Sequence, residues 1–392
     1  MPIKNRFSEL QAEITQWRQD FHAHPELLYD VHRTAARVAE LLRSFGCDEV
    51  VEGVGRTGVV GLIHGRKQGS GKVIGLRADM DALPIQEVTG LDYASKTDGM
   101  MHACGHDGHT AMLLGAAKYL TETRNYDGHA VVVFQPAEEG GAGGREMCRD
   151  GLMERFGIQE IYGMHNSPGL PVGQFAIRPG ATLASSDTFE IIVTGQGGHA
   201  AEPQKAVDTT LAAAQILVSL QSLVSRNVSP LKRVVLTVGT FVTDSDAVNI
   251  IAHTAKMCGT VRTLDPECRA LAERRVREIA KYTAQAFGAR AEVIWEEGYP
   301  ATINSPEHTA YAAEVARNIC GEVDDETDPI MPAEDFSYML EERPGAYIFL
   351  GNGDTPNCHH PAYVFDDEAI PFGSSWYVGM VEQRMPLDGK EG

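Results

Sequence analysis

The chain has 392 residues, which exceeds the size of most single hydrophobic cores and fits two domains. Acidic residues outnumber basic ones by 54 to 34, which gives a formal net charge of −20. Such a surface repels phosphate backbones and anionic lipid, so we expect no nucleic-acid partner and no membrane partner. The seven cysteines include no C-x-x-C pair, which argues against a disulfide framework and a four-cysteine zinc site. Neither a signal peptide nor a run of about 18 apolar residues is evident, so we expect a cytoplasmic protein.

The first part of the chain alternates predicted helices and strands. Apolar side chains at three- and four-residue spacing predict an opening amphipathic helix through Phe7, Leu10, Ile14, Trp17 and Phe21. A second helix is predicted from about 34 to 45, ended by Gly46. Strand, strand, helix and strand then follow at 59–63, 73–76, 111–120 and 130–134. This alternation predicts a mixed, mainly parallel sheet flanked by helices.

A different order of elements begins near Phe189. Strand, helix, two strands, helix and strand are predicted at 189–194, 208–224, 234–241, 255–261, 267–287 and 291–295. This is the order of a ferredoxin-like unit. We therefore predict an α/β catalytic domain formed by residues 1–184 and 299–392, with a ferredoxin-like α+β domain of residues 185–298 inserted in it. The acidic stretch 322–328 is predicted to be a solvated loop.

A cysteine and a histidine two residues apart form the first candidate metal-binding segment. Cys104 and His106 lie in a glycine-flanked turn just before a predicted helix, so both can face one centre. A thiolate is a strong ligand for Zn²⁺ and similar ions. The alternative is a buried free cysteine beside surface histidines. Three histidines within five positions of Cys104 favour the metal site.

Two adjacent carboxylates form the second segment. Glu138 and Glu139 follow an apolar strand, at the edge of an α/β sheet where ligands bind. Because adjacent side chains diverge, one carboxylate can bind a metal while the other remains free as a general base. The alternative is an exposed acidic turn.

Single histidines complete the set of possible ligands. His165 follows another predicted strand, and His359 and His360 precede Pro361 near the C-terminus. Taken alone, each is as well explained by a hydrogen-bonded core histidine or a polar loop. Taken together with the cysteine and the glutamates, they form a mixed nitrogen, oxygen and sulfur donor set. Such a set suits Zn²⁺, Mn²⁺, Co²⁺ or Ni²⁺ better than Ca²⁺ or Mg²⁺.

The order of these segments resembles a known family, the hippurate hydrolase and indole-acetyl-amino-acid hydrolase branch of the aminoacylase–carboxypeptidase metallopeptidases. The similarity runs over nearly the whole chain. The segments that carry it are Arg18–Leu27, Leu76–Pro84, His102–His109, Gln135–Gly140, Gly163–His165 and Gly197–Ala200.

The resemblance implies two divalent metal ions per subunit. The implied ligands are Cys104, which would bridge the ions, together with His106, Glu139, His165 and one C-terminal histidine. The family spacing to Pro361 and Tyr363 indicates His359, with His360 as the alternative. Asp79 stands where related branches have a histidine ligand, so Asp79 and Asp81 are expected to orient the ligands rather than to bind metal.

The resemblance also implies roles in the reaction. Glu138 would be the general base. His199, supplied by a partner subunit or by closure of the inserted domain, would stabilise the oxyanion of the reaction. From its own chemistry, Arg262 could clamp a substrate carboxylate, since an arginine fork matches that group, and Asn249 could donate to the same carboxylate or to the carbonyl. Without the resemblance, His199 would be interpreted as a surface-turn residue and Arg262 as a solvated strand end.

The predicted activity is hydrolysis of small-molecule N-acyl-amino acids to a carboxylic acid and a free amino acid. A dipeptidase or a deacylase of amino-acid conjugates could use the same site. Two further hypotheses are a non-catalytic, metal-stabilised acyl-amino-acid binding protein and a structural zinc protein. The resemblance further implies a homodimer or homotetramer.

Overall fold

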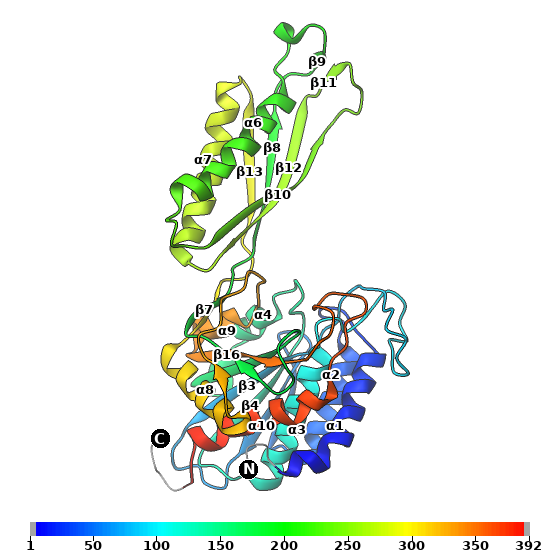
Figure 1. Cartoon of the computed structure of the whole chain (residues 1–392), viewed down its shortest axis with the longest axis vertical. Coiled ribbons are helices and arrows are strands. Elements are labelled where there is room, and N and C mark those ends of the chain that lie inside the picture. The colour runs from blue at the N-terminus through cyan, green and yellow to red at the C-terminus, as the bar shows by residue number, and fades with distance from the viewer. Residues whose placement is uncertain (1–4, 388–392) are drawn as a thin grey trace. The chain divides into compact units, whose positions relative to one another are not determined.

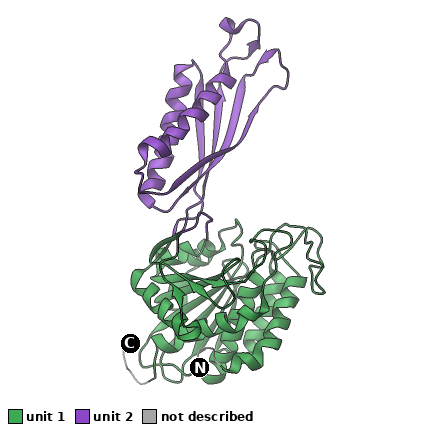
Figure 2. Cartoon of the chain, viewed as in Figure 1, with its two compact units in different colours: residues 1–182, 303–328, 335–392 green, residues 183–302, 329–334 purple. Residues whose placement is uncertain are grey.

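The computed structural model describes residues 5–387, and the chain divides into two compact units, shown in Figures 1 and 2. Unit 1 comprises residues 1–182, 303–328 and 335–392, and unit 2 comprises residues 183–302 and 329–334. The segment 329–334, which the predicted boundaries place in the catalytic domain, belongs to unit 2. One reason is that the Ala184 N–H donates to the Pro332 carbonyl oxygen at 3.0 Å.

Unit 1 is built on an eight-stranded mixed sheet in the order β1-β2-β4-β3-β5-β16-β6-β15. The four central strands β4, β3, β5 and β16 run parallel to one another, whereas β1 and β2 are antiparallel to their neighbours. The strands are β1 Glu49–Val54, β2 Gly58–His64, β3 Val73–Asp79, β4 His129–Gln135, β5 Glu160–Ser167, β6 Phe175–Ala176, β15 Val323–Asp324 and β16 Gly345–Gly351. The predicted loop 322–328 therefore contains a short edge strand, which pairs with β6.

Helices pack around this sheet. They are α1 Asn5–Ala23, α2 His32–Phe45, α3 His106–Thr123, α4 Gly143–Arg149, α5 Leu152–Arg155, α8 Pro306–Cys320, α9 Ser337–Glu342 and α10 Ile370–Arg384. Helix α3 contacts β3, and α1, α2 and α10 pack against α3. All five apolar residues that predicted α1 are buried. Gly46 ends α2 in the left-handed conformation, as its position in the sequence indicates.

Unit 2 contains a four-stranded antiparallel sheet in the order β10-β12-β8-β13. Its main elements are β8 Asp187–Thr194, α6 Thr209–Ser222, β10 Val234–Thr243, β12 Thr254–Thr263, α7 Pro266–Ala286 and β13 Arg290–Glu296. This is the ferredoxin-like arrangement, so the predicted fold class is confirmed. A two-stranded ladder of β9 Gly198–His199 and β11 Ile250–Ile251 extends from the unit, and β7 Gly180–Leu183 pairs with β14 Thr302–Asn304.

The two units have separate hydrophobic cores. In unit 2, α6 and α7 bury small and aliphatic side chains such as Ala213, Ile216, Val276 and Ala280 against the sheet. The N-cap Asp265 starts α7 by accepting the N–H groups of Glu267 and Cys268. Among residues 5–387, no helix is both long and apolar enough to span a lipid bilayer.

Candidate active site

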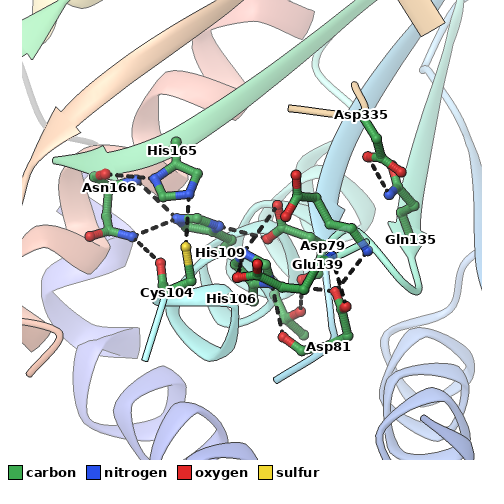
Figure 3. A network of polar contacts seen from close by, with 12 residues as sticks. Asp79, Asp81, Cys104, His106, His109, Gln135, Glu139, His165, Asn166 and Asp335 are labelled. Carbon is green, nitrogen blue, oxygen red and sulfur yellow. Dashed lines mark hydrogen bonds and ion pairs between the residues drawn. The ribbon is translucent and has the colours of Figure 1, made fainter. Parts of the chain in front are cut away.

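The candidate site lies at the carboxyl ends of the parallel strands of unit 1, where ligands of α/β sheets bind (Figure 3). Asp79 is the last residue of β3, Glu138 and Glu139 follow β4, and His165 lies in β5. Cys104 lies in the loop before α3, His106 is the first residue of α3, and His359 lies in the loop that follows β16. Segments far apart in the sequence therefore meet because their strands run in the same direction.

Five of the predicted ligands form overlapping clusters. Donor atoms lie within 4.8 Å of one another in the group Cys104, His106 and His165, in the group Cys104, Glu139 and His359, and in the group His106, Glu138 and Glu139. Cys104, His106 and Glu139 each belong to two of these groups, so the groups form one continuous cluster. The residues predicted as metal ligands are thus brought together by the fold.

The orientation of His106 suits metal binding. Its Nδ1 donates to the backbone oxygen of Asp81 at 2.8 Å, which directs Nε2 toward the carboxylates of the cluster. Nε2 is buried and has no hydrogen-bond partner in the part of the chain that the structure describes. It lies 3.8 Å from Asp79 Oδ2 and 3.9 Å from Glu139 Oε1. An unpaired buried nitrogen facing carboxylates is costly unless a cation or water satisfies it, so the residues present fit a metal ion.

The neighbouring histidines differ in which ring nitrogens are engaged. His165 Nδ1 donates to the backbone oxygen of Asn166 at 2.7 Å, and its Nε2 lies 3.4 Å from Cys104 Sγ. Burial lowers the pKa of His165, so this imidazole stays neutral, as a ligand must. His109 has both nitrogens occupied, by Asp79 Oδ1 at 2.7 Å and by the Asn166 N–H at 2.9 Å. His109 therefore orients its neighbours rather than offering a free donor.

The loop that follows β16 distinguishes His359 from His360. His359 has φ +68°, a left-handed conformation that costs roughly 1–3 kcal/mol in a non-glycine residue. This conformation directs its Nε2 to within 3.3 Å of Glu139 Oε1. The His360 ring instead accepts the Ala362 N–H at 3.1 Å. The geometry therefore favours His359 as the residue that joins the cluster.

Asp81 holds the Glu138–Glu139 turn in place. Its two carboxylate oxygens accept the backbone N–H groups of Glu138 at 3.0 Å and Glu139 at 3.1 Å. The turn also requires a left-handed residue, Ala137, at φ +54°. Both glutamate side chains consequently reach the donor cluster, and Glu138 is buried.

Charge in the site is arranged around buried carboxylates. Burial opposes ionisation of Asp79, but His106 and Arg77 hold the pKa of its carboxyl well below the ordinary value. Burial also opposes ionisation of Glu139, whose pKa is nevertheless lowered by His359 and His106. The pKa of the Cys104 thiol is raised well above its usual value by its hydrogen bond to Cys358, by burial and by Glu139. A divalent ion would reverse this last effect because the thiolate is the metal-binding form.

Several contributing residues were not identified from the sequence. Asn166 donates its amide to the Cys104 carbonyl at 2.6 Å and accepts the Tyr363 hydroxyl at 2.8 Å. Gly105 lies so close to Asn166 and Tyr363 that a Cβ atom would approach their polar atoms to 2.3 and 2.5 Å. The position of Asn166 directly after His165 was the available signal for that residue, and Tyr363 entered the sequence analysis only through its spacing to His359.

A second unpredicted network lies behind Asp79. The Arg77 guanidinium is fully buried and donates to Asp79 at 2.7 Å, to Gln135 at 2.9 Å and to Asp335 at 3.0 Å. Asp335 also accepts the Gly144 N–H at 2.8 Å. This network connects β3 and β4 to the segment that precedes α9.

The residues predicted to bind the substrate lie in unit 2 and separate into two groups. His199 in β9 pairs with Ile250 in β11, and the Ala200 N–H donates to the Asn249 oxygen at 3.0 Å. His199 is exposed and is brought close to Asn249. Arg262 lies eight residues beyond Thr254 on β12, so roughly 26 Å of extended strand separates it from that end of the sheet. One copy of unit 2 therefore does not bring Arg262 together with His199.

Comparison with known proteins identifies the family. The model of peptidase family M20/M25/M40 matches residues 75–383. This chain belongs to that peptidase family. The hippurate hydrolase of Campylobacter jejuni is 44% identical over 372 residues, which cover 94% of this chain and 96% of that protein. The resemblance inferred from the motifs is thus confirmed, and the M20-family chain is a hydrolase.

Two further relatives extend the comparison. The N-acetylcysteine deacetylase of Bacillus subtilis is 40% identical over 94% of this chain and 95% of its own length. A solved structure of a dinuclear metal-binding M20 peptidase from Bacillus subtilis is 35% identical and covers 95% of this chain and 98% of that chain, with a TM-score of 0.83. Together with the donor clusters, these relatives support a metal cofactor for the M20-family chain.

Proposed function

We propose that this protein hydrolyses the amide bond of N-acyl-amino acids and releases a carboxylic acid and a free amino acid. The observation that carries the proposal is the placement of Glu138, a buried carboxylate beside the donor cluster that is not needed as a ligand. Two relatives, a hippurate hydrolase and an N-acetylcysteine deacetylase, support the same substrate class.

Two divalent ions would be held by Cys104, His106, Glu139, His165 and His359. The mixed donor set suits Zn²⁺, Mn²⁺, Co²⁺ or Ni²⁺. Bound ions of this kind lower the pKa of water and polarise an amide carbonyl. Asp79 and Asp81 support the set, since Asp79 holds His109 and Asp81 holds both His106 and the glutamate turn.

Glu138 would move the proton in this reaction. Its carboxylate takes a proton from the attacking water and delivers it to the nitrogen of the leaving amino acid, so it is regenerated in each cycle. Burial at 7% exposure keeps bulk water from competing for that proton. The Asp81 carboxylate keeps the Glu138 backbone fixed while its side chain carries out the transfer.

Substrate recognition would use unit 2. Arg262 would pair with the substrate carboxylate, and His199 and Asn249 would bind the reacting carbonyl or the same carboxylate. The distance along β12 between Arg262 and the His199 end supports a site in which the two come from different copies of the chain. The exposed apolar residues Val235, Phe241 and Val242 on edge strand β10 support a homodimer or homotetramer formed through this strand. The cytoplasmic location stays a prediction.

The Glu138→Gln variant tests the proposed function, with hydrolysis of hippurate, acyl- and indole-acetyl-amino acids and dipeptides as the assay. We expect the unsubstituted protein to cleave an N-acyl-amino acid. The variant should lose at least about 100-fold in kcat and retain its metal content. A protein that binds acyl-amino acids but never cleaves them with any metal would instead be a binding protein. One tightly held ion per chain, without hydrolysis, would indicate a structural zinc site.

A further inference from the structure

A second thiol lies beside Cys104, one of the proposed ligands. The His359 N–H donates to the Ala103 oxygen at 2.7 Å, which holds the two chain segments side by side. The Cys358 thiol lies 4.0 Å from the Cys104 carbonyl oxygen and 4.0 Å from Asn166 Oδ1, and the Asn166 amide donates to that same carbonyl at 2.6 Å. A thiol 254 positions away in the sequence therefore lies beside the Cys104 backbone.

Cys358 has no part in the donor clusters. Within residues 5–387, the groups that contain Cys104 also contain His106, His165, Glu139 or His359, but Cys358 belongs to none of them. Neither cysteine forms a disulfide in the structure. Cys358 is half-buried and lies directly before the exposed residue His359, so a small oxidant can approach the pair from the loop side. The proposed reaction does not use the Cys358 thiol.

We propose that Cys104 and Cys358 form an oxidation-sensitive thiol pair, which a peroxide converts to a disulfide and which bound metal protects. The disulfide follows from the placement of the two thiols alone. Only its consequence, release of metal from the site, rests on the proposed function, because that function makes Cys104 a ligand.

The chemistry balances with hydrogen peroxide as the oxidant. A thiolate attacks one peroxide oxygen, the O–O bond breaks, and a sulfenic acid and hydroxide are formed. The second thiol then attacks the sulfenic sulfur, the S–O bond breaks and the S–S bond forms. The departing hydroxide takes the proton of that thiol and leaves as water. Two electrons pass from the two sulfurs to the peroxide, and a dithiol reductant reverses the change.

Metal occupancy controls the availability of Cys104. A coordinated sulfur has its reactive lone pair engaged, whereas the metal-free thiol remains open to oxidation. Conversely, a disulfide sulfur carries no negative charge and is a poor ligand for a divalent ion. Oxidation and metal binding therefore compete for the same atom, and the metal-depleted protein is the sensitive form.

The full-length protein is prepared in two forms, loaded with metal or stripped of metal by chelation, and each form is treated with hydrogen peroxide. The free thiols are then alkylated, and the peptides are analysed by mass spectrometry. We expect a linked Cys104–Cys358 peptide pair as the main product in the stripped protein, reversed by dithiothreitol. Metal loading should slow its formation by about tenfold or more. Equal rates in the two forms, or a linkage between other cysteines, would overturn the proposal.

Two serine variants complete the test. In Cys358→Ser no linked pair can form, and the buried Cys104 should remain a free thiol because it lacks the more accessible partner that reacts first. The matched control is Cys320→Ser, a half-buried thiol that donates to the backbone oxygens of Ala316 and Glu322 and should behave as the unsubstituted protein. Over-oxidised Cys104 without a linked pair in the unsubstituted protein would refute the inference. Because this readout needs no hydrolysis, an inactive protein that still forms the pair would reject the proposed function alone.

Discussion

The carboxylate of Asp81 accepts the backbone N–H of Glu138 at 3.0 Å. Its other oxygen accepts the N–H of the next residue, and its own backbone oxygen accepts His106 Nδ1–H at 2.8 Å. One residue thus fixes a proposed general base, a proposed ligand on the same turn and a second proposed ligand on α3. This concentration of contacts makes Asp81 a positioning residue whose loss affects metal binding and catalysis together.

Replacing Asp81 by alanine should lower metal affinity and kcat/KM by about 10- to 100-fold, since outer contacts of this kind orient the ligands. Metal affinity can be measured by competition with a chromogenic chelator and activity with the best N-acyl-amino acid substrate. The control is Asp98→Ala, which removes an exposed loop carboxylate. Unchanged metal affinity in Asp81→Ala would show that the turn holds its position without this carboxylate.

Arg77→Met should reduce the free energy of unfolding by about 3–5 kcal/mol, because it leaves the buried carboxylates of Asp79 and Asp335 without their shared cation. Denaturant unfolding followed by circular dichroism measures the loss. Arg43→Met is a matched control, since Arg43 pairs with Glu52 at 2.6 Å where both side chains are about half exposed. The control should cost at most about 1 kcal/mol. Equal losses in the two variants would contradict a special role for the buried network.

His22 should make stability depend on pH in the alkaline range. Burial opposes its protonation, but the Asp107 carboxylate at 2.8 Å raises the pKa of His22 from 6.5 to about 9. A raised folded-state pKa contributes stability that is complete below about pH 6.5 and is lost as pH rises through about 9. The contribution is at most about 3.4 kcal/mol, at 1.36 kcal/mol per pKa unit for the shift from 6.5 to about 9.

Unfolding titrations from pH 6 to pH 10 test this expectation. The free energy of unfolding should fall over that range in the unsubstituted protein and fall less in His22→Gln. His24→Gln, which alters a more exposed histidine two residues further on, should keep the original slope. Identical slopes in the protein and in His22→Gln would assign the pH dependence to other groups.

Mixing two inactive variants tests whether His199 acts across subunits. His199→Ala and Glu138→Gln should each be inactive alone, whereas co-expression should restore about a quarter of the activity if subunits pair at random. Each mixed dimer then contains one site with an intact Glu138 and an intact His199 from the partner. A protein that stays monomeric, or mixtures that remain inactive, would place His199 in the same chain as the site it serves.

The sequence predicted the elements whose information is local. The spacing from Phe7 to Phe21 defined the buried face of α1, and Gly46 marked the end of α2. The donor residues were also predictable, because cysteine, histidine and glutamate at strand ends carry recognisable chemistry. Helix α3 begins at His106, five residues before the apolar pattern indicated. Its first turn consists of His106, Asp107, Gly108 and His109, which belong to the site and carry no apolar pattern.

Contacts between distant residues could not be predicted. The partners Arg77 and Asp335 are 258 positions apart, and Tyr363 reaches Asn166 across 197 positions. No local pattern encodes such pairs, because they depend on which strands become neighbours in the sheet. The choice between His359 and His360 likewise depended on a backbone conformation, with φ +68° at His359, that the sequence does not reveal.

The central claim is that hydrolysis depends on metal ions held by the five proposed ligands, Cys104, His106, Glu139, His165 and His359. One titration tests this claim most directly. The protein is stripped with a chelator, and Zn²⁺, Mn²⁺, Co²⁺ or Ni²⁺ is returned stepwise while hydrolysis of hippurate and related N-acyl-amino acids is followed. We predict no activity without metal and a rise that saturates near about two ions per chain for the preferred metal. Activity that survives exhaustive removal of metal would contradict the account.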